Sequence, residues 1–260
     1  MINQLRADLY LLPRSAVPAL CLLTVSITAG LYTWLHHLLA TGEVGAAAAG
    51  DMQGLSDVLL VSLLGPLLYG VVVSQPFSTK SVHNALLGSS RAAFVASKTV
   101  TAALLVAALS LPYGVAVLVG RATGAQFVTT IHTGFSLALG EPGALTWPAV
   151  GQVLAITLTS ALLAAAKLSV CLPLAFWLRR PLVVMAFGFV WSFIADLLAD
   201  FASRVDVLDA LIRLSPFSSH HMPAPESSSA DFLATIVVSV VFIALMGAAS
   251  WLVFRRADVK

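Results

Sequence analysis

The chain has 260 residues, of which 59% are hydrophobic and 10% are charged. A soluble domain carries roughly 25% charged residues, so this composition excludes an ordinary water-soluble globular protein. The net charge of +2 comes without a basic cluster interleaved with aromatic residues, and we therefore expect no nucleic-acid partner.

Six apolar stretches approach the ~20 residues that a transmembrane helix needs. They cover residues 17–39, 58–74, 96–119, 149–178, 182–200 and 232–254. The sequence therefore predicts an all-α integral membrane protein with six transmembrane helices, in which residues 1–260 form a single transmembrane domain.

The segment before the first stretch, residues 1–15, places Leu5, Leu9 and Leu12 at helical spacing among charged residues. This pattern predicts an amphipathic helix lying at the membrane interface. The apolar run that follows Arg14 is longer than the roughly 7–15 residues of a signal-peptide core, so we expect no cleaved signal.

The connection between the second and third stretches, residues 75–97, is too long for a simple turn, and its apolar residues recur at helical spacing. It combines polar and apolar side chains at helical spacing: Lys80, Val82, His83, Asn84, Leu86, Leu87 and Arg91. A short amphipathic helix fits this pattern.

The fourth stretch is too long to cross a bilayer at right angles. Residues 149–178 would measure about 45 Å as one helix, against a hydrocarbon core of about 30 Å. We expect this segment to tilt, protrude or break, with the kink at Pro173.

A second long segment, residues 201–230, precedes the last stretch. Within it, residues 203–214 carry an apolar stripe beside charged residues, which predicts a surface-lying or partly re-entrant helix. Residues 215–229 are rich in proline and serine and are predicted to be an irregular linker.

Basic residues are divided unequally between the two sides of the predicted membrane domain. The side with both termini and the two even-numbered loops holds ten of the 14 Lys and Arg residues and only two acids, Asp8 and Asp258. The other side holds the remaining ten acids against Arg121, Arg204 and Arg213. Because Lys and Arg are retained in the cytoplasm during insertion, both termini are predicted to be cytoplasmic.

Motifs for enzymatic chemistry are missing from the sequence. There is no metalloprotease His-Glu-x-x-His, no Gly-x-Ser-x-Gly elbow and no phosphate-binding loop, so we expect neither an enzyme nor ATP hydrolysis by this chain. Cys21 and Cys171 fall inside apolar stretches and predict no disulfide or metal site. The pairs His36-His37 and His220-His221 are interpreted as polar residues at the outer surface, and metal binding at the outer face is the alternative.

Lys167 and Asp196 are the ionisable residues placed deepest in the predicted membrane domain. Counted from the cytoplasmic ends of their helices, they lie about 16 Å and about 21 Å deep. An unpaired charge at such a depth is unfavourable. The two residues therefore form a structural ion pair or line a hydrated substrate path, unless Lys167 extends to the interface without Asp196.

The same connection between the second and third stretches carries a family resemblance. The run Lys80-Ser81-Val82-His83-Asn84-Ala85-Leu86-Leu87, then Ser90-Arg91 and Ser97-Lys98, resembles the intracellular loop of ABC-2 type transporter permeases. That loop typically reads Gly-Thr-Ile-Lys-Asn-Leu-Leu, then Ser-Arg, then Ser-Lys. Asp8-Leu9-Tyr10 followed by Arg14-Ser15 is similar to the N-terminal segment of the same family. Lys80 replaces the family's Gly, and no acid precedes it in residues 74–79.

The resemblance implies a multi-pass exporter subunit in a bacterial cytoplasmic membrane. In this family the loop forms a cytoplasmic coupling helix that docks on a separate ATPase subunit, which binds ATP and Mg²⁺. By resemblance, that role falls on residues 78–91, through Ser78, Lys80, Ser81, Val82, His83, Asn84, Leu86, Leu87 and Arg91. The other interpretation is a plain amphipathic segment on the membrane surface.

The expected function is export of an amphiphilic substrate: a peptide antibiotic, a toxin peptide or a drug. The expected partners are the ATPase subunit, a second permease copy or a similar permease, and membrane lipid. No cofactor is expected in this chain itself. Two alternatives remain: a proton-coupled secondary transporter using Lys167 and Asp196, and a membrane immunity protein that transports nothing.

Overall fold

The computed structural model describes residues 2–11, 14–45, 50, 52–79, 81–87, 89–129, 132–141, 143 and 145–255. Within these residues the chain forms helices and no strand. In chain order the helices are α1 (Ile2–Leu11), α2 (Ala16–Thr41), η2 (Met52–Leu55), α4 (Asp57–Ser78), α5 (Val82–Leu87), α6 (Arg91–Ala108), α7 (Leu111–Ala122), α8 (Gly134–Gly140), α9 (Trp147–Leu168), α10 (Cys171–Leu178), α11 (Pro181–Ala202), α12 (Asp206–Arg213), η3 (Ser219–His221) and α13 (Ser229–Arg255).

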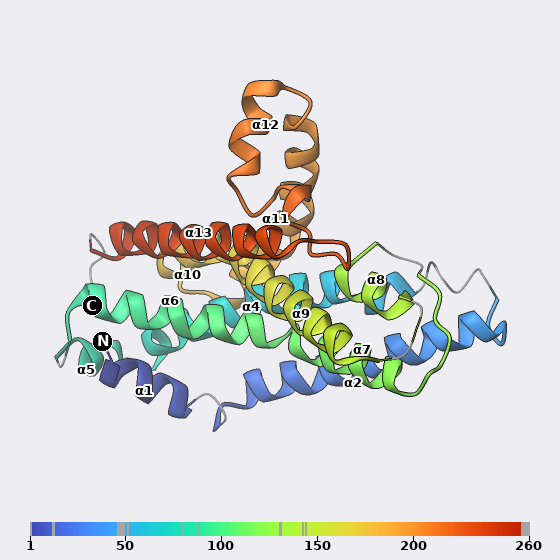
Figure 1. The fold of residues 1–260 in the computed structure, drawn as a ribbon. Helices are drawn as coiled ribbons and strands as arrows, with labels where there is room; N and C mark the ends of the chain where they lie inside the picture. The colour runs from blue at the N-terminus through green and yellow to red at the C-terminus, as the bar shows by residue number, and fades with distance from the viewer. Residues whose placement is uncertain are drawn as a thin grey trace.

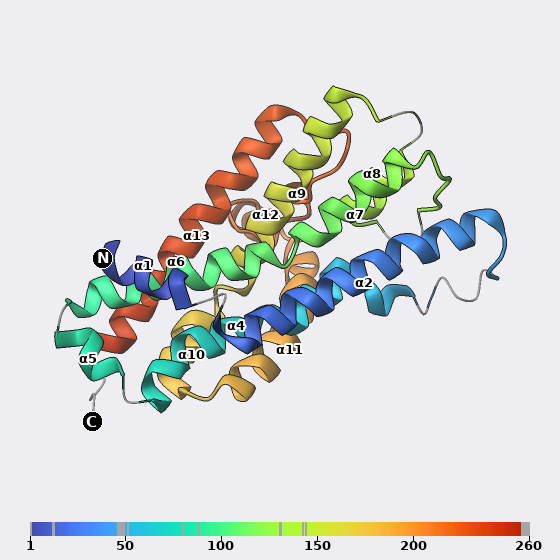
Figure 2. The same cartoon turned by 90° about the horizontal axis from the view of Figure 1, so that it is seen from below.

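Six of these helical segments are long and apolar enough to cross a membrane, with α6 and α7 together making the third. This confirms the prediction of an all-helical chain with six such segments. The long helices form an elongated bundle, and α1, α5 and the last turn of α13 lie at the same end of it (Figures 1 and 2).

Local sequence signals set several helix boundaries. The Ser56 hydroxyl accepts a hydrogen bond from the Leu59 amide, and the Ser90 hydroxyl accepts one from Ala93, so these serines cap the starts of α4 and α6. At its other end, α2 terminates at Gly42, which has a φ of 76°. That left-handed conformation suits glycine because it has no Cβ.

Two of the membrane-length segments are interrupted, and each interruption precedes a proline. The fourth predicted stretch is divided after Leu168, where α9 ends, and α10 begins at Cys171. Pro173 cannot donate to the carbonyl four residues earlier and its ring crowds that carbonyl, which belongs to Ser169 in the gap. The same geometry relates Pro112 to Ala108, the last residue of α6. The break in the fourth stretch was predicted and the break in the third was not.

Glycines allow close approach between α4 and α11. A Cβ on Gly188 would lie 2.5 Å from Cys171 Sγ and from Pro66 Cβ, and one on Gly70 would lie 2.9 Å from the Pro181 Cα. Small residues at such positions are the usual means of packing helices in lipid, where apolar burial alone gives little driving force between helices. α11 therefore lies along α4 at short range.

Four phenylalanines from four helices meet at the end of the bundle where α5 lies. Phe77, Phe94, Phe176 and Phe254 have ring centroids 5.4–6.5 Å apart. We call this group the phenylalanine cluster. The Arg179 guanidinium lies 4.5 Å from the Phe77 ring centroid, a cation–π distance.

The segment between α11 and α13 projects from the bundle and then returns to it. α12 stands clear of the long helices in Figure 1 and was predicted as residues 203–214. After it, a ring nitrogen of His221 lies 2.8 Å from the Arg213 carbonyl oxygen, and the Thr235 hydroxyl donates to the His221 carbonyl at 3.4 Å. The predicted irregular linker thus contains η3, which is attached to both neighbouring helices.

Candidate functional site

Lys167 and Asp196 meet in the structure. Lys167 Nζ, in the last turn of α9, lies 2.7 Å from Asp196 Oδ1 on α11. The two side chains are 29% and 48% exposed, so the contact lies at the edge of the protein and not in its core. This contact excludes the interpretation in which Lys167 extends to the interface without contacting Asp196. The structural pair and the polar path both remain compatible with it.

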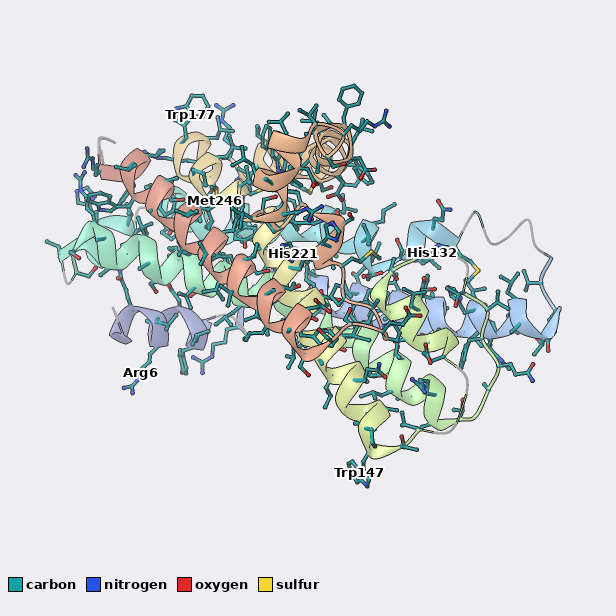
Figure 3. All side chains as sticks on the ribbon, turned by 45° about the horizontal axis from the view of Figure 1, so that its top comes forward. Arg6, His132, Trp147, Trp177, His221 and Met246 are labelled. Atoms are coloured by element: carbon teal, nitrogen blue, oxygen red, sulfur yellow. The ribbon has the colours of Figure 1, made fainter. Side chains whose placement is uncertain are left out.

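The ion pair forms part of the wall of a cavity of about 310 Å³. Besides Lys167, its lining includes Asp57 at the start of α4 and residues 217–219, 222 and 223 of the segment around η3. Polar side chains from three long helices line it: Asp57, Ser62, Ser160, Lys167, Asp196 and Asp200. We call this space the polar cavity. Figure 3 places His221, the last residue of η3, over the middle of the molecule beside α13.

Asp57 is the first residue of α4 and lines the polar cavity. Its Oδ1 is buried and has no hydrogen-bond partner in the structure. Sequence reasoning counted Asp57 and Asp200 only as acids of the outer side and missed their place in this site. One signal was available: Asp196 and Asp200 are four residues apart in a helix, which places them on one face.

The predicted coupling segment contains a shorter helix than expected. The predicted range was 78–91, whereas α5 covers only Val82–Leu87. Lys80 lies outside the described residues, as do the side chains of Ser78 and Asn84, although both residues belong to helices. The Ser81 hydroxyl lies 2.9 Å from the Thr79 hydroxyl.

Val82, Leu86 and Leu87 are the apolar residues of the predicted amphipathic helix, and they do not lie on one side of α5. Val82 is buried and Leu86 packs against the core, but Leu87 is 86% exposed. The helical period explains the difference, because residues four apart share a face whereas residue 87 is turned about 140° from residue 82. His83 is exposed as well. Arg91 contacts the end of α13, where its Nη1 donates to the Arg255 carbonyl at 2.9 Å.

The N-terminal fragment of the family resemblance contacts the last fragment of the loop resemblance, Ser97-Lys98. Asp8 of α1 accepts a hydrogen bond from Lys98 Nζ at 2.7 Å and from the Ser97 hydroxyl at 2.9 Å. The Lys98 and Asp8 side chains are only 10% and 15% exposed. This link between α1 and α6 was not predicted, although Asp8 was one of only two acids on the basic side of the chain.

The histidine and cysteine predictions have different outcomes. His36 is not at the surface: it is fully buried, and its Nδ1 lies 2.5 Å from the Val128 carbonyl oxygen. His221 is also buried, which corrects its surface placement, whereas its neighbour His220 is exposed. Cys21 and Cys171 are buried free thiols. Among the described residues, no three His, Cys, Asp or Glu side chains gather in an arrangement that could hold a metal ion.

No model of a known protein family matches this chain, and no curated protein matches it. The resemblance to ABC-2 type permeases therefore rests on the short sequence motifs described above.

Proposed function

We propose that this chain is the membrane-spanning subunit of an ABC exporter in a bacterial cytoplasmic membrane. A separate ATPase subunit, which binds ATP and Mg²⁺, drives it, and a second copy or a similar permease completes the assembly. The substrate is amphiphilic: a peptide antibiotic, a toxin peptide or a drug. Both chain ends and α5 face the cytoplasm, and α1 lies along the inner membrane interface.

The main support for the proposal is the position of α5. This helix presents an exposed apolar side chain at the end of the bundle where basic residues lie. Arg91, Arg179 and Arg255 lie at this end with α1. Cationic ends remain cytoplasmic during insertion. Leu87, 86% exposed on a helix of six residues, is suited to enter a groove of a cytoplasmic partner.

The chain's tryptophans also fit a membrane protein. Trp147 begins α9 and Trp177 lies near the end of α10, and they are 88% and 71% exposed. Figure 3 shows both side chains pointing away from the bundle. Tryptophans collect at the two membrane–water interfaces, and these two flank the fourth membrane segment.

The anchoring of α5 suggests how motion would reach the membrane. Val82 and Leu86 hold α5 against the bundle, and α5 connects α4 to α6. Rigid-body movement of a partner bound at Leu87 would therefore be passed to two membrane helices at once. The contact of Asp8 with Lys98 makes α1 move with α6.

The test of this proposal is the ATPase activity of a copurified partner subunit. Leu87→Asp should abolish stimulation of that activity by the permease while its thermal stability stays unchanged, because Leu87 packs against nothing. Leu214→Asp is the matched control, since Leu214 is 75% exposed beyond α12. Normal stimulation by Leu87→Asp, or equal loss in the control, would remove α5 from the coupling role.

Topology is tested separately by cysteine labelling. The native thiols are buried, so the background should be low. His83→Cys should be labelled only from the cytoplasm and Glu226→Cys only from outside, following the basic-residue asymmetry. Labelling of both positions from one side would refute the six-span orientation.

A proton-coupled secondary transporter is the second candidate, because the Lys167–Asp196 pair lines a cavity. Ionisable residues within a membrane often belong to proton relays. Transport in proteoliposomes that contain the permease alone, driven by a proton gradient without ATP, would favour this candidate over the first.

A further inference from the structure

The polar cavity lies where the membrane helices are irregular. Ser110, in the break between α6 and α7, contributes to its wall, and so does Leu168 at the end of α9. Pro66 within α4 cannot donate to the carbonyl of Ser62, which also lines the space. Irregular backbone at membrane depth is tolerated where it is buried in protein or borders a hydrated cavity. Interrupted helices are also a common way to build substrate sites in transporters.

The charges of the polar cavity do not balance. Three carboxylates, Asp57, Asp196 and Asp200, face a single ammonium group on Lys167. Lys167 forms an ion pair with Asp196. The carboxylates of Asp57 and Asp200 therefore lack a cationic partner among the residues that line the cavity. Asp57 adds a buried Oδ1 that accepts no hydrogen bond. An unpaired charge in apolar surroundings is unfavourable, and a bound cation would relieve this imbalance.

Part of the rest of the wall is apolar, beside further serine and threonine side chains. Val61, Leu163, Phe217 and Met222 line it, and the Phe217 ring is held edge-on against Trp191 at a centroid distance of 6.3 Å. A volume of about 310 Å³ is at the lower end of the range for small-molecule pockets. The space therefore suits one amine and a short apolar body, and not a whole folded peptide.

We propose that the polar cavity binds the ammonium group of an amphiphilic cation, with Asp57 and Asp200 as its counter-ions. Lys167 is an internal cation that occupies Asp196 and competes with the ligand for the site's negative charge. The apolar wall receives the ligand's hydrocarbon part. That such a ligand is the exported substrate rests on the proposed function, whereas its binding does not.

Calorimetric titration of the full-length protein in phosphatidylcholine nanodiscs tests the proposal. The probes are phenethylamine, the neutral phenethyl alcohol and the anionic hydrocinnamate, which share one ring and nearly one length. Phenethylamine should bind at least about tenfold more tightly than either analogue, because a charge-assisted contact is worth more than a neutral one. Equal binding of the three probes, or no binding of the amine above empty nanodiscs, would overturn the proposal.

Two substitutions locate the site. Asp57→Asn and Asp200→Asn should each weaken phenethylamine binding about tenfold, since each removes one counter-ion. Glu226→Gln removes a similar exposed acid outside the cavity and should leave binding unchanged. Asp200 is exposed at the rim, so its variant should fold even if Asp57→Asn does not. Unchanged affinity in Asp200→Asn would contradict the assignment.

Lys167→Met gives a result in the opposite direction. Removing the internal cation should tighten phenethylamine binding about tenfold, and the amine should raise the melting temperature of this variant more than that of the wild type. Weaker binding in Lys167→Met would show that Lys167 does not compete with the ligand.

These assays need no ATPase subunit, so amine binding without a copurifying partner would reject the exporter and keep the site. Stimulation of a partner ATPase without amine binding would support the exporter and reject the site.

Discussion

Breaking the contact between Asp8 and Lys98 should detach α1 from α6. Asp8→Ala leaves the Lys98 ammonium only 10% exposed and without its carboxylate. Removing one partner of a buried ion pair typically destabilises a protein by about 3–5 kcal/mol. We expect about 3 kcal/mol here, because α1 is at the edge of the bundle and can move to admit water.

Replacing Lys98 instead of Asp8 should reduce the stability less. Lys98→Met leaves the Asp8 carboxylate with the Ser97 hydroxyl, which donates to its second oxygen at 2.9 Å. One remaining hydrogen bond to a charged group is worth about 1.5–3 kcal/mol, so the expected loss is about 2 kcal/mol. The double variant should lose about 2–3 kcal/mol less than the sum of the two single losses, because it leaves no unpaired charge.

Thermal unfolding in detergent measures these differences, and hydrogen exchange of the α1 amides reports whether the loss is local. A loss of about 3 kcal/mol corresponds to a drop of roughly 6–12 °C for a chain of this size. Arg6→Met is the matched control, since Arg6 is an exposed cation on the same helix and points away from the bundle in Figure 3. Additive effects of the two single substitutions, with unchanged exchange in α1, would refute the reasoning.

The Lys167–Asp196 pair should show a weaker coupling in the same kind of double-mutant cycle. Because its side chains are 29% and 48% exposed, Lys167→Met and Asp196→Asn should be coupled by only about 0.5–1 kcal/mol in thermal stability; strict additivity would exclude a structural role. Gly188→Ala should destabilise the protein by about 1–3 kcal/mol, since the new Cβ would overlap Pro66 and Cys171. Gly151→Ala, in open space on α9, should be neutral or stabilising by up to about 1 kcal/mol, and similar melting temperatures for the two variants would contradict the described packing.

The features that could be predicted are those that depend on one segment of sequence at a time. Apolar length defines a membrane helix. A helix break precedes Pro173, as predicted, and Pro112, which was not predicted, whereas Pro66 and Pro76 lie within the unbroken α4. The meeting of Lys167 and Asp196 was one of the arrangements that the sequence allowed, because both residues were placed at similar depths from the same side. The break after Leu168 interrupts the helix along which the depth of Lys167 was counted.

The features that could not be predicted are contacts between segments that lie far apart in the sequence and have no fixed position relative to each other before folding. Asp8 reaches Lys98, and His36 reaches the backbone at Val128, across about 90 residues of chain. The polar cavity brings Asp57 at the start of α4 together with residues of the segment around η3, more than 150 residues later in the chain. Helix length and charge asymmetry contain no information about such returns.

The phenylalanine cluster has a consequence for ion permeability. Its four rings come from α4, α6, α10 and α13, and none of them lines the polar cavity. A file of water that ran between these four helices would have to separate the rings, since aromatic side chains offer neither room nor hydrogen bonds to water. In this conformation the space between α4, α6, α10 and α13 should therefore conduct neither protons nor small ions.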